Sequence, residues 1–311
     1  MAVTKLSANP TATTRSPSKQ RSQFNKNLIA YSFILPNLIG FAIFTLIPMA
    51  FSLVLAFMNW DGANQISWAG LANFQQLLKD DTFLISLKNT LYYVIATVPL
   101  TMIASLGLAL LLNQPIRGRN IFRTLFFFPY VASLVAIAVV WNLLFFPSAG
   151  PVNEFLHALG VANPPRWAAS VDWAMITVIL ASIWKGMGYY MVIYLAALQG
   201  IPVILYEAAS IDGANAWQKF YYVTLPMLTP ASFFISVILT ITSFKVFDLI
   251  MVMTGGGPGR ATNVLVIDIY NTAFQQFRFG YSSSIAMVLL VLVLGITIVQ
   301  FYMEKRWVNY Q

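Results

Sequence analysis

The sequence predicts an all-α integral membrane protein with six transmembrane helices. Hydrophobic residues make up 59% of its 311 residues and charged residues only 9%, whereas soluble domains carry about a quarter charged residues. Six stretches of the chain are mostly apolar and reach the length of about 20 residues that a helix needs to cross a bilayer. The chain also has no cysteine, which excludes a disulfide framework, a thiolate metal site and a cysteine nucleophile.

The six predicted spans follow one another between charged segments. They are centred on residues 33–57, 89–112, 124–146, 173–198, 228–252 and 282–303. Several prolines fall inside these runs or at their ends, where membrane helices tolerate them, and they predict kinks or helix starts: Pro36, Pro48, Pro99, Pro129 and Pro230. We expect one transmembrane domain over residues 28–308.

Residues 1–27 differ in composition from the rest. They are basic, contain no acidic residue and are rich in Ser, Thr, Pro and Asn, so they have too little apolar surface to fold alone. We predict a disordered cytoplasmic tail. A secretory signal is disfavoured because the apolar run that follows is long and lacks a small-residue cleavage site, whereas an organellar transit peptide is compatible with the composition.

The distribution of Lys and Arg predicts the orientation. Eleven lie in the N-terminal tail, the 113–123 turn, the 199–226 loop and the C-terminus, whereas the opposite loops hold only five, namely Lys79, Lys88, Arg166, Arg260 and Arg278. Cytoplasmic segments carry the excess of positive charge. Both termini are therefore expected in the cytoplasm.

Nucleic-acid binding and catalysis are both disfavoured. The net charge is +8, but the basic residues are scattered beside apolar runs rather than gathered on a polar domain. The phosphate-binding pattern GxxxxGK[ST] is absent, since the similar stretch GGGPGRAT at 255–262 lacks the lysine and is better explained as a turn. His157 is the single histidine, and no carboxylate pair has a catalytic spacing. We predict no catalytic residue, no metal site and no cofactor held by this chain.

The loop 199–226 is polar although it lies between two apolar runs. Pro202 suits the first turn of a helix, and the residues that follow give a short helix an apolar stripe. Asp212 and Gly213 end that helix, because glycine readily takes the left-handed conformation. Residues 214–223 predict a second short helix rich in aromatic residues. By physical pattern alone, the loop is either such a helix-turn-helix with a partner or an interfacial hairpin that only connects two spans.

The same loop resembles a known motif. Glu207-Ala208-Ala209, then Gly213, then Leu225-Pro226 resembles the EAA motif of the permease subunits of ABC importers, with Val223 where the family usually has isoleucine. Four further segments resemble the carbohydrate-uptake branch of these permeases, and the resemblance extends over residues 28–308. These segments are Trp184-Lys185-Gly186, Leu198-Gln199-Gly200-Ile201-Pro202, Phe244-Lys245-Val246-Phe247-Asp248 and Thr254-Gly255-Gly256-Gly257-Pro258.

The resemblance implies a type I ABC importer permease fold and a passive transport subunit in a bacterial or archaeal cell membrane. In this family the loop is a coupling helix that docks on a separate ATPase dimer, which binds ATP and Mg. A second, related permease chain and an extracytoplasmic sugar-binding protein complete the assembly, and the remaining surface meets lipid. The residues that the resemblance assigns to ATPase coupling are Glu207, Ala208, Ala209, Asp212, Gly213, Leu225 and Pro226.

Three ionisable residues lie inside predicted spans: Lys185, Lys245 and Asp248. Such residues are costly in a bilayer and face the protein interior or a water-filled path. Lys245 and Asp248 are three residues apart, so on one helix they share a face and can form an ion pair. Either that pair fixes helix packing, or the two residues line the substrate pathway. Together with nearby aromatic residues, the candidate pathway set is Trp184, Lys185, Tyr189, Tyr190, Phe244, Lys245, Phe247 and Asp248.

Three other functions compete with sugar import. A glycerol-phosphate importer belongs to the same branch, but a phosphate substrate favours arginines in the pathway, and the predicted spans contain none. An ion-coupled secondary transporter predicts acids at mid-membrane and repeated discontinuous helices. A membrane anchor or sensor needs neither intramembrane charges nor a coupling motif.

Overall fold

The computed structural model describes residues 31–307, so the predicted tail at 1–27 lies outside the described residues. The chain divides into two units at residue 54. The first unit consists of the apolar helix Tyr31–Leu55 up to that point, with a π-helical segment η1 (Ala42–Leu46) followed by α2 (Ile47–Leu55). The second unit begins at Leu55 and contains all of the elements described below.

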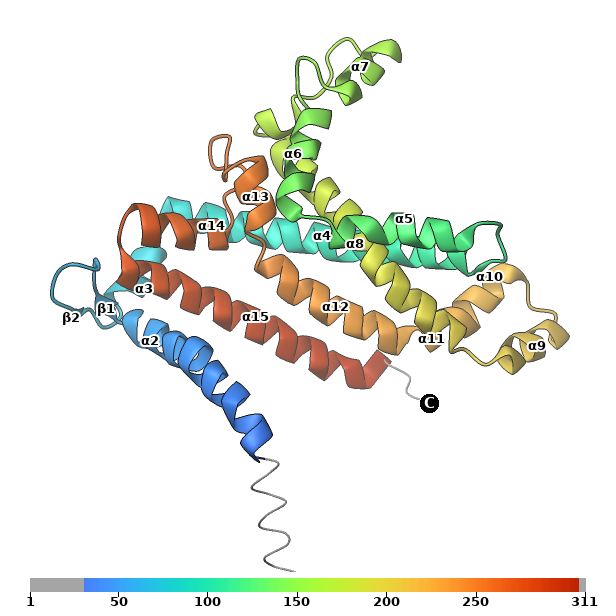
Figure 1. The fold of residues 1–311 in the computed structure, drawn as a ribbon, viewed down its shortest axis with the longest axis horizontal. Helices are drawn as coiled ribbons and strands as arrows, with labels where there is room; N and C mark the ends of the chain where they lie inside the picture. Colours follow the sequence, from blue (N-terminus) through green and yellow to red (C-terminus); the bar gives the residue numbers. More distant parts are fainter. Residues whose placement is uncertain (1–30, 308–311) are drawn as a thin grey trace, which may run out of the picture. The chain divides into compact units, whose positions relative to one another are not determined.

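Long apolar helices form the centre of the second unit. α4 (Asp81–Asn113) packs against α8 (Ala174–Gln199) and α12 (Thr229–Phe244), and α12 in turn packs against α15 (Phe279–Trp307) (Figure 1). Asp80 caps α4, because its carboxylate accepts a hydrogen bond from the backbone N–H of Thr82 at 2.8 Å. These helices confirm the predicted all-α membrane fold.

α4 owes its close packing to small side chains. Ser, Thr and Ala recur at intervals of about four residues on its buried face, namely Ser86, Thr90, Thr97, Thr101, Ser105 and Ala109. Several of the hydroxyls donate to the carbonyl four residues earlier, as Ser105 does to Thr101 at 2.6 Å. Small residues let helix backbones approach closely in a membrane, where burial of apolar surface gives no driving force.

Two of the six predicted spans are not single helices. The third is divided into α5 (Arg119–Val131) and α6 (Leu134–Leu144), which meet at 101°. The fifth ends as α12 at Phe244 and restarts as α13 at Asp248 (α13, Asp248–Met253). Ala132 and Ser133 adopt extended backbone conformations, which ends the third helix although the hydropathy continues without a break.

Short elements join the long helices at the ends expected to be external. The strands β1 (Met58–Asn59) and β2 (Ser67–Trp68) pair in antiparallel fashion and are followed by α3 (Ala72–Leu77). Between α13 and α15 lie α14 (Leu265–Tyr270) and the π-helical η4 (Asn271–Gln275). α7 (Pro151–Ala158) and η2 (Trp167–Ala169) connect α6 to α8.

The loop that follows α8 is a helix-turn-helix. α9 (Val203–Ile211) is followed by a turn in which Gly213 has φ +78°. α10 (Ala216–Lys219), the π-helical η3 (Phe220–Thr224) and α11 (Leu225–Met227) then lead into α12. Asn215 and Gln218 form a capping box at the start of α10, which satisfies backbone N–H groups that the helix itself leaves free.

Candidate functional site

A cavity of about 270 Å³ lies between α4, α8 and the break that separates α12 from α13. Hydroxyl groups dominate its polar wall, and two lysines and one aspartate complete it. The polar and charged lining residues are Tyr93, Thr97, Thr101, Tyr130, Ser182, Lys185, Tyr190, Thr242, Ser243, Lys245 and Asp248. Such a wall offers many hydrogen bonds and little net charge.

The cavity contains five of the eight candidate pathway residues: Lys185, Tyr190, Lys245, Phe247 and Asp248. The other three lie elsewhere. Trp184 packs on Trp141 with a ring-centroid separation of 5.9 Å, and Tyr189 stacks on Tyr130 at 4.3 Å. Phe244 belongs to the hydrophobic core and is 1% exposed. All three pack against other protein side chains and are not among the residues that line this cavity, so their place in the pathway stays a prediction.

Lys185 holds the bend in the third span. Its ammonium group donates to the carbonyl oxygens of Tyr130 at 3.0 Å and Pro129 at 3.3 Å, with Ala132 at 3.5 Å. These carbonyls lie at the C-terminal end of α5, where the helix dipole favours a positive charge. The ammonium group also lies 5.6 Å from the Tyr130 ring centroid. Lys185 therefore lines the cavity and caps a helix end at the same time.

Of the two alternatives for Lys245 and Asp248, the ion pair on one helix is not formed. The chain leaves the helical path between them, because α12 ends at Phe244 and α13 begins at Asp248. Among the described residues, neither side chain forms an ion pair or a hydrogen bond, and both are exposed. Lys245 follows the C-terminus of one helix and Asp248 starts the next, so each charge has the sign that the adjacent helix dipole favours.

Several cavity residues were missed from the sequence. The hydroxyl of Tyr93 donates to Ser182 Oγ at 2.8 Å and joins α4 to α8. The hydroxyls of Thr97 and Thr101 are buried without a hydrogen-bond partner among the described residues. Unpaired buried hydroxyls are costly, so these two side chains keep hydrogen-bonding capacity at the cavity wall. The four-residue spacing of small polar residues in the second span was the available signal.

α9 and α10, which follow the C-terminal end of α8, present an exposed surface. Glu207, Asp212 and Gly213 are all exposed there. Apolar side chains accompany them, with Ile204 68%, Ile211 86% and Trp217 71% exposed. Leu225 and Pro226 begin α11, and Ala208 and Ala209 lie on α9. Large exposed apolar patches with a polar rim mark surfaces that bind a protein or a membrane.

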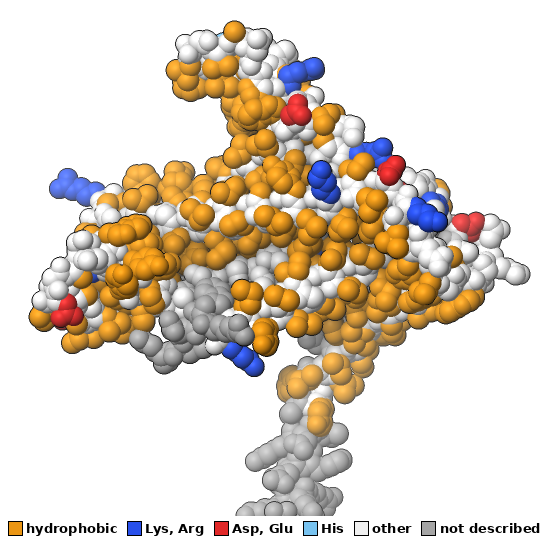
Figure 2. All heavy atoms as spheres, turned by 180° about the vertical axis from the view of Figure 1, so that it is seen from behind, with side chains coloured by type: hydrophobic (Ala, Val, Ile, Leu, Met, Phe, Trp, Pro, Cys, Tyr) orange, Lys and Arg blue, Asp and Glu red, His pale blue; other side chains and the backbone are white. Residues whose placement is uncertain are grey.

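Apolar side chains also cover most of the molecular face in Figure 2, where charged side chains are few and scattered. Exposed apolar residues follow the long helices and include Ile95, Ile103, Leu111, Ile298 and Val299. Such helices are stable when lipid or other apolar protein surfaces surround them.

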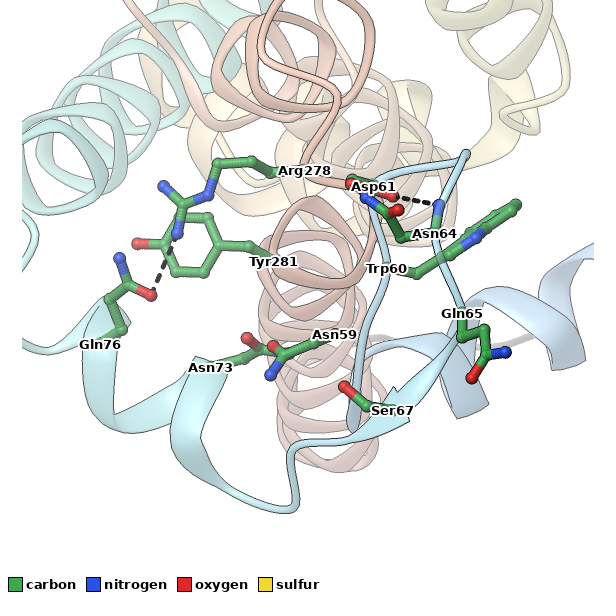
Figure 3. Close-up of a pocket in the computed structure, with 10 residues that line it drawn as sticks. All are labelled: Asn59, Trp60, Asp61, Asn64, Gln65, Ser67, Asn73, Gln76, Arg278 and Tyr281. Atoms are coloured by element: carbon green, nitrogen blue, oxygen red, sulfur yellow. Dashed lines mark hydrogen bonds between the residues drawn. The ribbon is translucent and has the colours of Figure 1, made fainter.

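A second, polar cavity of about 300 Å³ lies at the β1–β2 hairpin, beside α3 and the start of α15 (Figure 3). Its lining combines amide and hydroxyl side chains with one acid, Asp61, and one base, Arg278. The pKa of Asp61 is lowered by hydrogen bonds from Asn64 and Ala63, so this carboxylate is ionised at neutral pH. Across residues 31–307, no group of three or more His, Cys, Asp or Glu side chains is arranged to hold a metal ion.

Asp268 is a buried carboxyl group, in contrast to the exposed Asp61. Asp268 on α14 is 5% exposed. Burial, followed by the negative charge of Asp80, raises its pKa to about 6, although hydrogen bonds from Ser86 and Thr272 act in the other direction. Desolvation disfavours the charged form of a carboxyl group, so Asp268 titrates close to neutral pH.

Comparison with known proteins shows similarity over almost the whole chain. The family model described as "Binding-protein-dependent transport system inner membrane component" matches residues 101–309. The probable ABC transporter permease protein YesP of Bacillus subtilis is 39% identical over 297 residues, covering 94% of this chain and 96% of YesP. The sn-glycerol-3-phosphate transport system permease protein UgpA of Yersinia pestis is 37% identical over 298 residues, covering 94% of this chain and 100% of UgpA.

Solved structures give the same result. A chain of a bacterial ABC transporter involved in the import of the acidic polysaccharide alginate superposes with a TM-score of 0.82 at 26% identity, covering 94% of this chain and 100% of that chain. The alginate transporter in complex with an alginate pentasaccharide-bound periplasmic protein gives a TM-score of 0.81 at 26% identity, covering 92% of this chain and 96% of that one.

Proposed function

Because the chain belongs to the family of binding-protein-dependent transport system inner membrane components, we propose that it forms half of the path through which an ATP-driven importer takes up a sugar. The observation that carries this proposal is the hydroxyl-rich cavity at the break between α12 and α13, in a chain similar along its length to a subunit of a polysaccharide importer. Hydroxyl groups with little net charge suit a ligand that is itself rich in hydroxyls.

The charge of the cavity favours a sugar over glycerol phosphate. UgpA supports the second substrate, because it is named as a permease for sn-glycerol-3-phosphate. However, no arginine lines the cavity, and the ammonium group of Lys185 is taken by backbone carbonyls. Lys245 remains as a single unpartnered cation, and Asp248 lies close in the chain. A phosphate group is better matched by arginine side chains, which bind it through two hydrogen bonds.

The α9–α10 surface is the proposed site of contact with an ATPase dimer, which binds ATP and Mg. Glu207 presents a charge beside the apolar side chains of Ile204 and Ile211. Gly213 allows the tight turn because its φ of +78° suits a residue without a Cβ atom. The predicted coupling residues Ala208, Ala209, Asp212, Leu225 and Pro226 complete this surface. The excess of Lys and Arg on this side supports a cytoplasmic position for it.

Two further partners follow from the proposal. A second, related permease chain supplies the other half of the path, as expected for an inner membrane component of this family. A sugar-binding protein on the opposite side of the membrane delivers the substrate to the external loops. We place the assembly in the cell membrane of a bacterium or archaeon, with both termini in the cytoplasm.

Proteoliposomes test the proposal. The chain, its partner permease, the ATPase subunits and the binding protein are reconstituted together, and uptake of a radiolabelled sugar panel and of sn-glycerol-3-phosphate is measured with and without ATP. We expect ATP-dependent uptake of a sugar. Uptake driven by a proton or sodium gradient without ATP would overturn the proposal, and uptake of glycerol phosphate alone would replace the substrate.

Variants of the loop test the coupling surface. Glu207→Ala and Gly213→Val are expected to reduce uptake at least tenfold while the chain still assembles with its partner permease. Glu154→Gln, which changes an exposed acid on α7, serves as the control. Unchanged uptake in both loop variants would contradict the assignment.

A further inference from the structure

The polar cavity at the β1–β2 hairpin is formed by side chains that the fold holds in place. Asn73 on α3 is 5% exposed and donates from Nδ2 to the carbonyl oxygens of Ala56 and Met58, both at 3.0 Å. Both amide protons are thereby used, so the orientation of the side chain is fixed. No described residue donates to its Oδ1 atom, which leaves a fixed acceptor in the wall of the cavity.

A fixed donor faces this cavity as well. Arg278 Nη2 donates to Gln76 Oε1 at 3.1 Å, and its guanidinium group lies 4.4 Å from the ring centroid of Tyr281. Tyr281 is held in turn by the hydrogen bond from its hydroxyl to Asp80 at 2.6 Å. Figure 3 shows Arg278, Tyr281 and Gln76 on one side of the cavity. Among the described residues, no hydrogen bond uses the other N–H groups of the Arg278 side chain, which can therefore bind a ligand.

Asp61 provides the balancing charge. It lies in the loop between β1 and β2, where its Oδ1 atom accepts hydrogen bonds from the backbone N–H groups of Ala63 at 3.1 Å and Asn64 at 2.8 Å. Its Oδ2 atom accepts from Asn64 Nδ2, so a ligand would use the second lone pair of each oxygen. Asn59, Gln65 and Ser67 add neutral polar groups. One acid and one base among neutral amides favour an uncharged ligand over an ion.

We propose that this cavity is an external binding site for one neutral sugar unit, separate from the cavity between α4 and α8. Planar carboxylate, amide and guanidinium groups present two neighbouring donor or acceptor atoms, which match the adjacent hydroxyl groups of a sugar ring. The volume of about 300 Å³ is at the lower end of the range for small-molecule sites and suits a single unit. The choice of ligand rests on the proposed sugar uptake.

The position of the site allows it to collect substrate before transport. The hairpin connects the first two spans on the side from which the substrate is expected to arrive. A weak sugar site there raises the local concentration of substrate near the transport path. The sugar has two sources, because it is either free in solution or one end of a sugar held by the binding protein.

The absence of cysteine in the chain allows a direct test. Ser67→Cys places a single thiol in the cavity wall, and Gln75→Cys places one on an exposed position outside it. Maleimide labelling of each is followed by mass spectrometry in the complete reconstituted transporter. The probes are the sugar that the same proteoliposomes take up, inorganic phosphate, and the binding protein with and without sugar.

We expect the transported sugar at millimolar concentration to slow labelling of the Ser67→Cys variant at least threefold and to leave the Gln75→Cys variant unchanged. Adding Asp61→Asn, which keeps the shape of the side chain, is expected to raise the protecting concentration at least fivefold. Protection by free sugar identifies the first source, and protection only by the sugar-loaded binding protein identifies the second.

Three results would overturn the proposal. They are no protection by a sugar that is transported, equal protection by phosphate, and equal protection by the sugar-free binding protein, which would identify a protein contact instead. In each of these cases uptake persists, so the proposed function stands. Failure of uptake for every sugar tested would remove the proposed function itself.

Discussion

The hydroxyl of Tyr206 lies 2.9 Å from Thr224 Oγ1 and joins α9 directly to the end of η3. Thr224 is 5% exposed, and Tyr206 packs beside the core formed by α8 and α12. A second link, from Lys219 Nζ to Ser210 Oγ at 2.7 Å, crosses the same turn. Side-chain links as well as the backbone of the turn therefore connect α9 to the segment that leads into α12.

We predict that Tyr206→Phe lowers the amount of sugar transported per ATP hydrolysed severalfold, because it removes the link and keeps the ring. Tyr222→Phe is the matched control, since Tyr222 is 72% exposed. In a double-mutant cycle, adding Thr224→Val to Tyr206→Phe is expected to cause little further loss. An unchanged transport-to-hydrolysis ratio in Tyr206→Phe would show that the backbone alone transmits the movement.

Gly188 lies where the backbone of α8 approaches that of α5. A Cβ atom at this position would lie 1.8 Å from the carbonyl oxygen of Phe126, whereas one at Gly186 would meet nothing nearer than 3.6 Å. Overpacking of a core costs about 1–3 kcal/mol or more. We predict that Gly188→Ala lowers the melting temperature and the yield of monodisperse protein in size-exclusion chromatography, and that Gly186→Ala leaves both near wild type.

Substitutions of the two cavity lysines, Lys185 and Lys245, are expected to have different effects. Lys185→Met leaves the carbonyls at the end of α5 without their donor, and hydrogen bonds to charged groups contribute about 1.5–3 kcal/mol. Its thermal stability should therefore fall, with partial rescue in Lys185→Arg. Lys245→Met removes no protein contact and should leave the melting temperature unchanged while altering uptake. Equal stability of Lys185→Met and wild type would contradict the role assigned to Lys185.

The raised pKa of Asp268 predicts that the stability of the folded protein depends on pH. Its pKa is raised by burial from the usual 3.8 to about 6 in the folded protein, so the folded state binds a proton more tightly than the unfolded state. The stability contributed by this group is present at low pH and is lost as the pH rises from about 4 to about 6. Asp268→Asn should therefore raise the melting temperature at pH 7.5, and the gain should diminish towards pH 5. A pH-independent gain would contradict the assignment.

The regular part of the fold followed from hydropathy. The predicted spans at 89–112, 173–198 and 282–303 correspond to α4, α8 and α15, and the helix-breaking glycine in the loop 199–226 lies at the turn after α9. Hydropathy cannot show a break inside an apolar run. The bend at Ala132 and Ser133 depends on tertiary contacts, among them Lys185, which lies more than fifty residues away in the chain.

The break inside an apolar run also limited what the sequence could predict about the cavity. Helical spacing placed Lys245 and Asp248 on one face only while the helix was assumed to be continuous, and the break at residues 245–247 removes that relationship. Trp184 and Tyr189 belong to the predicted pathway set, and their rings pack on Trp141 and Tyr130. No one-dimensional pattern reveals such ring partners in advance.

The interruption between α12 and α13 has a consequence for hydration. Where a helix stops within an apolar run, backbone groups at the break lose part of their intrahelical hydrogen bonding, and hydrocarbon cannot solvate them. Here the break opens on the hydroxyl-lined cavity, so the backbone at residues 245–247 meets a polar space. A sugar entering that space would find peptide groups as well as side chains to bind, and its own hydration could be exchanged for protein contacts in one step.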